Sequence, residues 1–395
     1  VLPEAEVRVV GSVRRRLETV GSLDLLLSSD DPEALAANAG AALEPAVTLG
    51  ERSPTGLSAQ LGGYRLHCAF APLEQQGAAL LYATGSAAYR QTLLERAAER
   101  GLELRPDGLY RNGAPLPTPE EADALSLLGL PYLPPERREA ENAVPVEGLL
   151  QLQDIRGLVH NHSSYSDAAD SLAAMVAATA AQGYAYYGSG DHSRSSTWAN
   201  GLSVERLTDQ GAHLRRLQEE LSAAGSSFTV LHGAEVDILA DGALDYPDEV
   251  LAGLDYTVVS VHQHFQLPEL EQTRRVIRAV EHPRAHILGH MTGRLLLRRP
   301  SYALDIEAVL RACADAGTII EINASPYRLD LDWRWAARGL ELGCAFALNP
   351  DAHSAGGLAD IRYGVAMARK AGLRARDVVN AEPSGSAFLA RLKPS

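Results

Sequence analysis

The sequence has few cysteines, no long hydrophobic run and no excess of positive charge. Only three cysteines occur among its 395 residues, at Cys68, Cys313 and Cys344, and none belongs to a CxxC pair. This spacing argues against a disulfide framework and favours reduced core residues in a cytoplasmic protein. No stretch of about 18 apolar residues is present, so no membrane span is expected.

The first ten residues, VLPEAEVRVV, contain neither an initiator Met nor a basic-then-apolar signal sequence. They lead almost directly into a strand-like run. We therefore expect the chain to be part of a longer protein.

From about residue 150 onward, apolar runs alternate with helical segments. The expected strands are 155–162, 184–192, 228–236, 256–262, 285–290, 317–323 and 344–353. Segments with helical spacing lie between them, for example 171–183, 204–225 and 268–282. Such βα units predict a parallel sheet, and seven of them suggest a barrel whose ligands collect at the carboxyl ends of its strands.

Nine potential metal ligands lie at or just beyond the ends of these strands. They are six imidazoles and three carboxylates: His160, His162, Asp167, His192, Glu235, His262, His290, Asp351 and His353. Two pairs have i, i+2 spacing, which would place both side chains on one strand face and let both reach one ion. Any single histidine could instead be an ordinary core or surface residue, as we expect for His213, His232, His264, His282 and His286. The joint pattern predicts a site for several divalent cations.

Imidazole ligands favour Mn²⁺, Zn²⁺ or Fe²⁺ over Mg²⁺ or Ca²⁺. Clustered ions lower the pKa of bound water and hold phosphoryl oxygens, so we predict hydrolysis of a phosphomonoester or phosphodiester. Glu235 is a catalytic candidate because its carboxylate can bridge two ions. Arg294 and Arg328 are catalytic candidates that would hold phosphate through forked hydrogen bonds, unless they form only a solvated basic face.

The net charge of −14 disfavours nucleic acid as a partner, because phosphates need local cations. Two features offset this objection. Three bound divalent ions would add about six positive charges where a phosphate lies. Basic residues also cluster locally, at 14–16 and at Arg294, Arg298 and Arg299.

The motifs that carry the predicted ligands are HNHSSYSD, GDHS, GAEVD, SVH, GHMTGR and DAHS. In this order they resemble the motifs of the PHP (polymerase and histidinol phosphatase) domain. The resemblance implies a distorted (β/α)7 barrel with three divalent transition metals, Mn²⁺ or Zn²⁺, with Fe also possible. It implies three ligand sets: His160, His162, Glu235 and Asp351; Glu235, His262 and His290; and Asp167, His192 and His353.

The first 145 residues have a different character, with strand-like runs and turns in 1–85, a short helix followed by a turn at 77–86, and two helical segments at 88–101 and 120–129. GSVRRRLETVGSLDLLL (11–27), LLYATGS (80–86) and LPPERRE (133–139) are similar to the palm and thumb of family X DNA polymerases. We therefore expect a partial α+β palm at 1–85, a thumb at 86–147 and an α/β PHP barrel at 148–395. Together the resemblances point to bacterial family X DNA polymerases with a C-terminal PHP domain.

The polymerase half departs from that family at its metal site. The family uses three carboxylates, but the matching positions hold Ser22, Asp24 and His67. One carboxylate positions two hard cations poorly, so we expect a degenerate nucleotidyl-transfer site that could still bind Mg²⁺ at Asp24. By resemblance Ser12, Arg15, Tyr82 and Gly85 contact nucleotide or DNA, and Arg90 stands where the family usually has Asn.

The resemblance implies an enzyme of bacterial DNA repair that is cytoplasmic and associated with the nucleoid. Its PHP site would act as a metal-dependent 3′–5′ exonuclease or phosphodiesterase on primer 3′ ends in gapped or recessed DNA. Three alternatives stay open. They are an active DNA polymerase in the full-length protein, a small-molecule phosphatase acting on a compound such as histidinol phosphate, and a DNA-binding scaffold. No oligomeric state is predicted.

Overall fold

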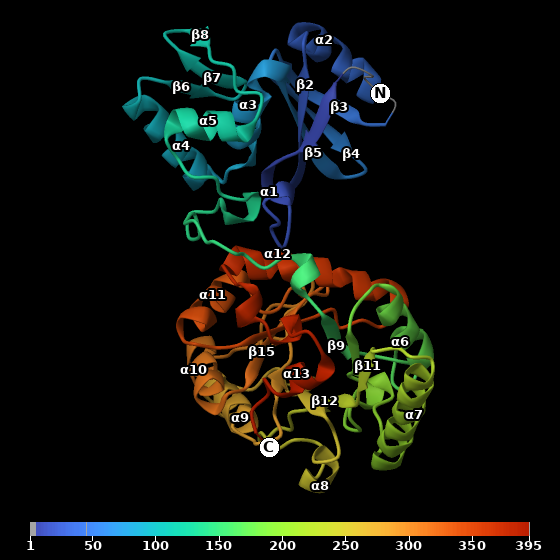
Figure 1. Ribbon diagram of the computed structural model, residues 1–395. Helices are drawn as coiled ribbons and strands as arrows, with labels where there is room; N and C mark the ends of the chain where they lie inside the picture. The colour runs from blue at the N-terminus through green and yellow to red at the C-terminus, as the bar shows by residue number, and fades with distance from the viewer. Residues whose placement is uncertain (1–4, 45, 395) are drawn as a thin grey trace. The chain divides into compact units, whose positions relative to one another are not determined.

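The computed structural model describes residues 5–44 and 46–394, which divide into two compact units (Figure 1). The first unit extends to Glu147 and the second begins at Gly148. Each has its own buried apolar clusters. Within the described residues, no helix combines the length and the apolar character needed to cross a membrane.

The first unit begins with a mixed five-stranded sheet in the order β1-β2-β5-β4-β3, in which only β2 and β5 are parallel. Its strands are β1 (Glu6–Val9), β2 (Ser22–Ser29), β3 (Thr48–Ser53), β4 (Gly56–Leu61) and β5 (Tyr64–Pro72), with helices α1 (Gly11–Arg14) and α2 (Pro32–Leu43) between them. For α2 the expectation of strands and turns is wrong. Asp31 caps this helix by accepting a hydrogen bond from the Ala34 amide, and Pro32 occupies its first turn.

The rest of the first unit is mainly helical. It contains α3 (Gln76–Thr84), α4 (Ala87–Glu99), α5 (Glu121–Leu128) and a small antiparallel sheet of β6 (Glu103–Arg105), β7 (Gly108–Arg111) and β8 (Ala114–Pro115). The helices predicted at 88–101 and 120–129 are therefore confirmed as α4 and α5. Gly101 and Gly129 follow their last turns with φ of 65° and 62°, the left-handed conformation that glycine adopts most easily.

A buried ionic network ties α1 to α5 within the first unit. The carboxylate of Glu121 accepts two hydrogen bonds from Arg14, at 2.8 and 2.9 Å, and two from Arg138, at 2.6 and 3.1 Å. The Arg138 side chain is fully buried. Burial raises the pKa of Glu121, but the hydrogen bonds and charges of the two guanidinium groups outweigh it and lower that pKa to about 2.

The second unit is built from parallel strands. They are β9 (Gly157–Asn161), β10 (Tyr186–Ser189), β11 (Thr229–Leu231), β12 (Gly233–Asp237), β13 (Tyr256–Ser260), β14 (Ile287–Leu288), β15 (Ile319–Asn323) and β16 (Phe346–Asn349). β11 and β12 are two halves of the strand expected at 228–236. The strands form two sheets, β11-β10-β9 and β12-β13-β14-β15-β16, and parallel bridges His192–Glu235 and Asn161–Ala352 join these sheets. The α/β class with parallel strands is confirmed, and the seven strand regions follow one another in chain order.

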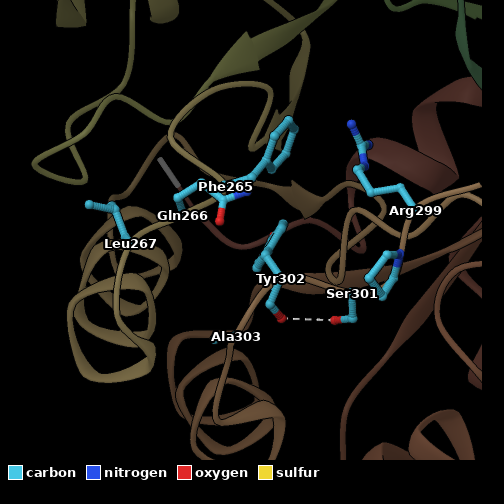
Figure 2. Close-up of a pocket in the computed structure, with 8 residues that line it drawn as sticks. Phe265, Gln266, Leu267, Arg299, Ser301, Tyr302 and Ala303 are labelled. Atoms are coloured by element: carbon cyan, nitrogen blue, oxygen red, sulfur yellow. Dashed lines mark hydrogen bonds between the residues drawn. The ribbon is translucent and has the colours of Figure 1, made fainter.

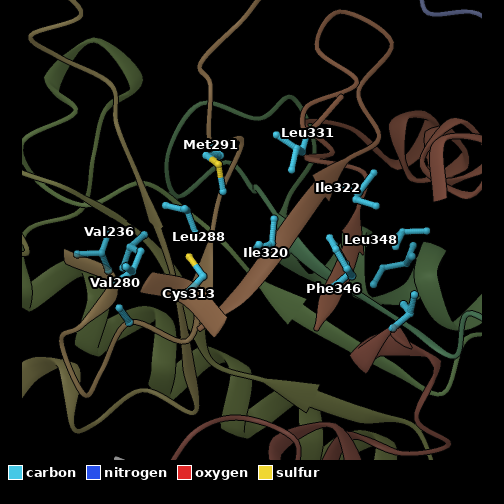
Figure 3. Packing of buried hydrophobic residues seen from close by; sticks show 14 of the residues in the cluster. Val236, Val280, Leu288, Met291, Cys313, Ile320, Ile322, Leu331, Phe346 and Leu348 are labelled. Atoms are coloured by element: carbon cyan, nitrogen blue, oxygen red, sulfur yellow. The ribbon is translucent and has the colours of Figure 1, made fainter. Parts of the chain in front are cut away.

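Helices connect these strands and surround them in Figure 1. The connecting helices are α6 (Leu172–Ala181), α7 (Val204–Ala223), α8 (Asp248–Leu251), α9 (Glu269–Val280), α10 (Ile306–Ala316) and α11 (Trp333–Glu341). The last strand is followed by α12 (Ile361–Ala371) and the C-terminal α13 (Gly385–Leu389). Leu288, Ile320 and Phe346 of the sheet pack in one buried cluster with Val280 of α9 and Cys313 of α10 (Figure 3).

The alternate residues of the same strands form a second cluster. Val159, Tyr186, Leu231, Tyr256, Val258, Ile287, Ile319 and Ala347 are buried together with Phe388 of α13. Because successive strand residues point to opposite faces, the two clusters lie on opposite faces of the sheet. Every one of the seven strand regions contributes to the second cluster, which therefore fills the inner face.

The inner face becomes polar towards the carboxyl ends of the strands. Two residues after Val159, Ile319 and Ala347 come Asn161, Glu321 and Asn349, all fully buried. Glu235 has the same parity on β12 and is 1% exposed. The strands thus place an apolar layer at one level of the interior and ionisable or amide side chains at the next.

We expect Glu121→Gln to destabilise the first unit by about 3–5 kcal/mol, because two guanidinium groups lose a buried counter-ion. The pKa of Glu121 is about 2 in the folded protein and 4.5 in the reference state. Its contribution is therefore present above about pH 4.5 and is lost as the pH falls towards 2.

Urea denaturation of parent and variant between about pH 7 and pH 3 measures this contribution, and the gap in unfolding free energy should narrow on acidification. Glu99→Gln, at an exposed ion pair with Arg96, is the matched control and should change stability little. A gap that stays constant with pH would show that the Glu121 network does not have the stated pKa.

Candidate metal centre

All nine predicted ligands converge at the carboxyl ends of the strands of the second unit. Their ligand atoms form four groups in which all atoms lie within 4.8 Å of one another. The groups are His162, Asp167, His192 and His353; His160, His162 and Asp351; His160, Glu235 and His290; and His192, Glu235 and His262. Glu235 belongs to two groups, as His160, His162 and His192 do, and it is the carboxylate among these four, so it has the position of a bridging ligand.

The Glu235 carboxylate lies among five imidazoles. Its Oε1 is 3.3 Å from His160 Nε2, 3.3 Å from His262 Nε2 and 2.9 Å from His290 Nε2, and its Oε2 is 2.9 Å from His192 Nδ1 and 3.8 Å from His162 Nε2. Burial raises the pKa of Glu235, but the charges of the surrounding histidines outweigh it and hold this pKa well below its usual range. The carboxylate is therefore ionised and able to act as a ligand.

The buried donor atoms of this cluster need partners. Among the described residues, His160 Nε2, His262 Nε2, both ring nitrogens of His162 and both oxygens of Glu235 are buried without a hydrogen bond. Each such atom costs roughly 1–3 kcal/mol. Ligand atoms about 2.1 Å from one tetrahedral ion lie about 3.4 Å apart, comparable with the 2.9–3.8 Å around Glu235. The donor set therefore fits divalent transition-metal ions.

The grouping differs in detail from the one that the resemblance implies. His290 groups with His160 and Glu235, whereas His262 groups with His192 and Glu235. The backbone also differs from a regular strand, because His160 and Asp351 have φ of 57° and 53°. The two i, i+2 pairs therefore do not lie on regular strand backbone, although His160 and His162 still share one ligand group and His353 Nδ1 lies 3.8 Å from Asp351 Oδ1. Positive φ at non-glycine residues is strained and is held here by the surrounding structure.

Two buried carboxylates outside the predicted set orient the candidate ligands. Glu321 on β15 lies 2.5 Å from His160 Nδ1 and accepts a 2.7 Å hydrogen bond from the His290 amide. Asp237 on β12 lies 2.6 Å from His262 Nδ1. A carboxylate on one ring nitrogen fixes which nitrogen faces a metal. Their signal in the sequence was an acidic residue at strand spacing inside the apolar runs GTIIEIN and GAEVD.

Asp191 supports the loop that carries Asp167. Its buried carboxylate accepts hydrogen bonds from the amide and hydroxyl of Ser163 and from the amide and hydroxyl of Ser166, at 2.6–3.1 Å. Gln210 of α7 donates to it as well, at 2.5 Å. This carboxylate, next to His192 in the chain, therefore holds Asp167 against the cluster, where Asp167 Oδ2 is 3.8 Å from His192 Nε2.

The candidate arginines have different surroundings. Arg328 Nε lies 3.5 Å from Asp351 Oδ2, so its guanidinium is at the ligand cluster. Arg294 donates instead to the backbone carbonyls of Arg328 and Leu329 and to Asp332 Oδ2 at 3.1 Å. Its hydrogen bonds hold the loop of Arg328, so the structure does not place Arg294 itself among the ligands.

The other two arginines of the predicted basic cluster, Arg298 and Arg299, lie against aromatic rings. Arg299 donates to the Gly293 carbonyl at 2.8 and 3.1 Å and lies over the Phe265 ring. Figure 2 shows Arg299, Phe265 and Tyr302 around a pocket of about 310 Å³. Phe265 is covered by Arg299 and stacked on Tyr302, with ring centroids 5.9 Å apart. Arg298 lies 5.5 Å from the Tyr327 ring centroid.

The three polymerase metal positions meet in the first unit. Asp24 on β2 is paired in register with His67 on β5. Ser22 Oγ donates to Asp24 Oδ1 at 2.9 Å, and His67 Nδ1 lies 3.0 Å from the same oxygen. One carboxylate thus stands where the resemblance expects three, and both neighbours already contact it.

The residues predicted to contact nucleotide or DNA are spread over α1 and α3. Arg15 donates to Glu139 and to the Thr84 carbonyl, each at 2.8 Å, and Ser12 lies on α1. Tyr82 is on α3, and Gly85 directly follows this helix. The Arg90 guanidinium lies 5.0 Å from the Tyr82 ring centroid.

Comparison with known proteins assigns both units to classes. Residues 79–139 match the model of the DNA polymerase beta thumb, and residues 159–325 match that of the PHP domain. The chain is 33% identical over 388 residues to the DNA polymerase/3′-5′ exonuclease PolX of Bacillus subtilis, a match that covers 94% of this chain and 66% of the relative. A probable phosphatase of Thermoanaerobacter sp. (strain X514) is 28% identical over 226 residues, which cover 52% of this chain and 88% of that protein.

The second unit is thus a PHP domain, and a polymerase thumb precedes it in the chain. The chain belongs to the family X DNA polymerases that carry a PHP domain. It spans 66% of the length of the Bacillus subtilis relative.

We expect Glu321→Gln to weaken divalent-metal affinity about 10- to 100-fold, because an amide supports the His160 ring less well than a carboxylate does. Titration of Mn²⁺ or Zn²⁺ against a chromophoric chelator measures the change without reference to activity. Glu341→Gln, an exposed glutamate of the same unit, is the control and should bind metal as the parent does. Parent-like affinity in Glu321→Gln would contradict an orienting role.

Proposed function

We propose that the PHP domain is a metal-dependent phosphodiesterase that removes nucleotides from the 3′ ends of DNA during repair. The principal support is Glu235, whose two oxygens face different sets of imidazoles and so suit it to join neighbouring cations. The polymerase thumb in the same chain favours a DNA substrate over a free metabolite. The printed name of the Bacillus subtilis relative includes both polymerase and 3′-5′ exonuclease.

We assign three divalent ions, Mn²⁺ or Zn²⁺ with Fe²⁺ as a further option, to the nine converging side chains. When bound, such ions supply Lewis-acid stabilisation of a phosphoryl group and activate water at neutral pH. The chain's own part is to present ionised carboxylates and imidazoles in a fixed arrangement, and the protonated rings must each release a proton when they bind an ion. Burial, together with the charges of nearby histidines, lowers the pKa of His162 to about 3. The His162 ring is therefore neutral near pH 7 and able to bind a metal ion.

Arg328 is the residue that we assign to the phosphate. Its side chain is 17% exposed and lies beside Asp351, so its free donors can reach a phosphoryl oxygen held at the cluster. Arg294 acts on Arg328 by anchoring the loop through the carbonyls of residues 328 and 329. Because Arg294 is committed to those carbonyls, we assign it a positioning role.

The double variant His160→Ala with His162→Ala should lose 3′–5′ nuclease activity by at least about 1000-fold while still binding DNA, because two ligands of the centre are removed. A 5′-labelled primer–template incubated with Mn²⁺ and no deoxynucleotides, followed on a gel, measures the loss. His282→Ala alters a histidine that pairs with Asp248 outside the cluster and should keep parent activity. Degradation at the parent rate by the double variant would refute the site assignment.

Assays of the same protein on DNA and on small phosphomonoesters separate the alternatives. The similarity to a probable phosphatase favours small phosphomonoesters as a second candidate substrate class. Release of phosphate from such esters without shortening of DNA would support that candidate. Binding of DNA with no product from either substrate would support a scaffold.

We further propose that the nucleotidyl-transfer site of the first unit is degenerate, with Asp24 as a residual Mg²⁺ ligand. The support is the contact of Ser22 and His67 with one Asp24 oxygen, which leaves a single anionic group to hold two hard cations. Arg15 forms an ion pair with Glu139. This ion pair engages the guanidinium group that would otherwise be able to contact a triphosphate.

Primer extension with Mg²⁺ and deoxynucleotides should therefore be no greater for the parent than for Asp24→Asn. The double variant Ser22→Asp with His67→Asp restores the family's carboxylates and should gain extension if the rest of the site is intact. His67 is half exposed, so a shorter acidic side chain fits without repacking. Extension by the parent that Asp24→Asn abolishes would show an active polymerase instead.

A further inference from the structure

A large aromatic side chain stands uncovered beside the candidate metal centre. Trp198 is 64% exposed, whereas the His192 and His262 side chains next to it are 3% and 5% exposed. Its ring centroid lies 5.3 Å from that of His192 and 5.9 Å from that of His262. These two histidines form one of the four ligand groups with Glu235. One part of the indole thus packs on a single ligand group and the rest faces solvent.

The loop that carries Trp198 is held in place by hydrogen bonds. Ser195 Oγ and Ser196 Oγ both donate to the carboxylate of Asp237, at 2.5 and 2.9 Å, and the Ser195 amide donates to Asp245 at 2.8 Å. Gln263 donates to the Ser195 carbonyl at 2.8 Å. Trp198 therefore stays exposed on a fixed support.

The far side of the loop is fixed as well. Asn200 follows the short turn Thr197–Ala199 with φ of 54°, and its side chain donates to the carbonyls of Tyr165 and Ser166 at 3.2 and 3.0 Å. An aromatic ring that is exposed and immobilised loses little conformational freedom when a flat ligand stacks on it.

We propose that Trp198 stacks on the base of the 3′-terminal nucleotide, and so makes the centre select nucleic-acid ends over simple phosphate esters. This inference rests on the proposed nuclease function. A phosphodiester held at the ligand group of His192, Glu235 and His262 brings the base joined to it next to the indole. Stacking on a tryptophan suits every base, because each base has a π face. Trp198 is thus a substrate-positioning residue.

A direct binding test uses an oligonucleotide that ends in 2-aminopurine, whose fluorescence falls when the base stacks. A phosphorothioate at its last linkage slows cleavage. Parent protein should quench this fluorescence, and Trp198→Ala should not. Trp335→Ala changes a partly exposed tryptophan on α11 and should quench as the parent does. Equal quenching by Trp198→Ala and the parent would overturn the proposal.

A kinetic test uses two oligonucleotides that differ only in a normal or an abasic 3′-terminal nucleotide. Trp198→Ala should lower kcat/KM about 10- to 100-fold on the normal end and less than about 2-fold on the abasic end, because only the former has a base to stack. Trp198→Phe should recover most of the loss. An equal fall on both ends would mean that Trp198 acts only through its histidine neighbours, which overturns the proposal.

The two tests separate this inference from the nuclease assignment. If the parent shortens neither oligonucleotide, the proposed function fails, but quenching that depends on Trp198 still establishes a base-stacking site. If the parent shortens both and quenching does not depend on Trp198, the nuclease assignment stands and the stacking role is refuted.

Discussion

The ionised carboxylate of Glu235, enclosed by imidazoles inside a parallel sheet, is the constraint around which the second unit is organised. An isolated charge in that position would cost several kcal/mol. The five facing histidine rings lower that cost, and they are themselves fixed by strand ends and by buried acids such as Glu321 and Asp237. The apolar layer around Tyr186, Tyr256 and Phe388 closes the interior at the opposite level. Polar chemistry and apolar packing are thereby separated along the direction of the strands.

The first unit uses buried charge differently. Both oxygens of the Glu121 carboxylate accept hydrogen bonds from Arg14 and Arg138, so neither is left to bind a ligand. This network therefore stabilises the fold. At Asp24 the neighbouring strand positions keep their register while the acidic side chains are missing. On our proposal of a degenerate site, this unit keeps the strand pairing that would hold two metal ions but lacks two of the carboxylates that such ions need.

The sequence was sufficient to predict the parallel α/β class and the convergence of the nine side chains, because strand ends in a parallel sheet meet at one edge. It did not predict the left-handed backbone of His160 and Asp351, which depends on packing rather than on local spacing. Glu321 was missed because an acid inside an apolar strand gives no sign of which imidazole it meets. Arg294 was placed at the phosphate on charge alone, and only the fold shows that its donors face the carbonyls of residues 328 and 329. Helix α2 was missed although its cap at Asp31 and Pro32 was visible in the sequence.

Asp237 connects the candidate metal ligand His262 with the loop that carries Trp198. The same carboxylate contacts His262 Nδ1 and receives the hydroxyls of Ser195 and Ser196, so one rigid anion joins a candidate ligand to the loop of Trp198. Any influence of ion occupancy on that loop must therefore have an equal counterpart in the other direction, since coupling free energies are reciprocal. The candidate ligand His262 and the loop of Trp198 thus depend on the same carboxylate.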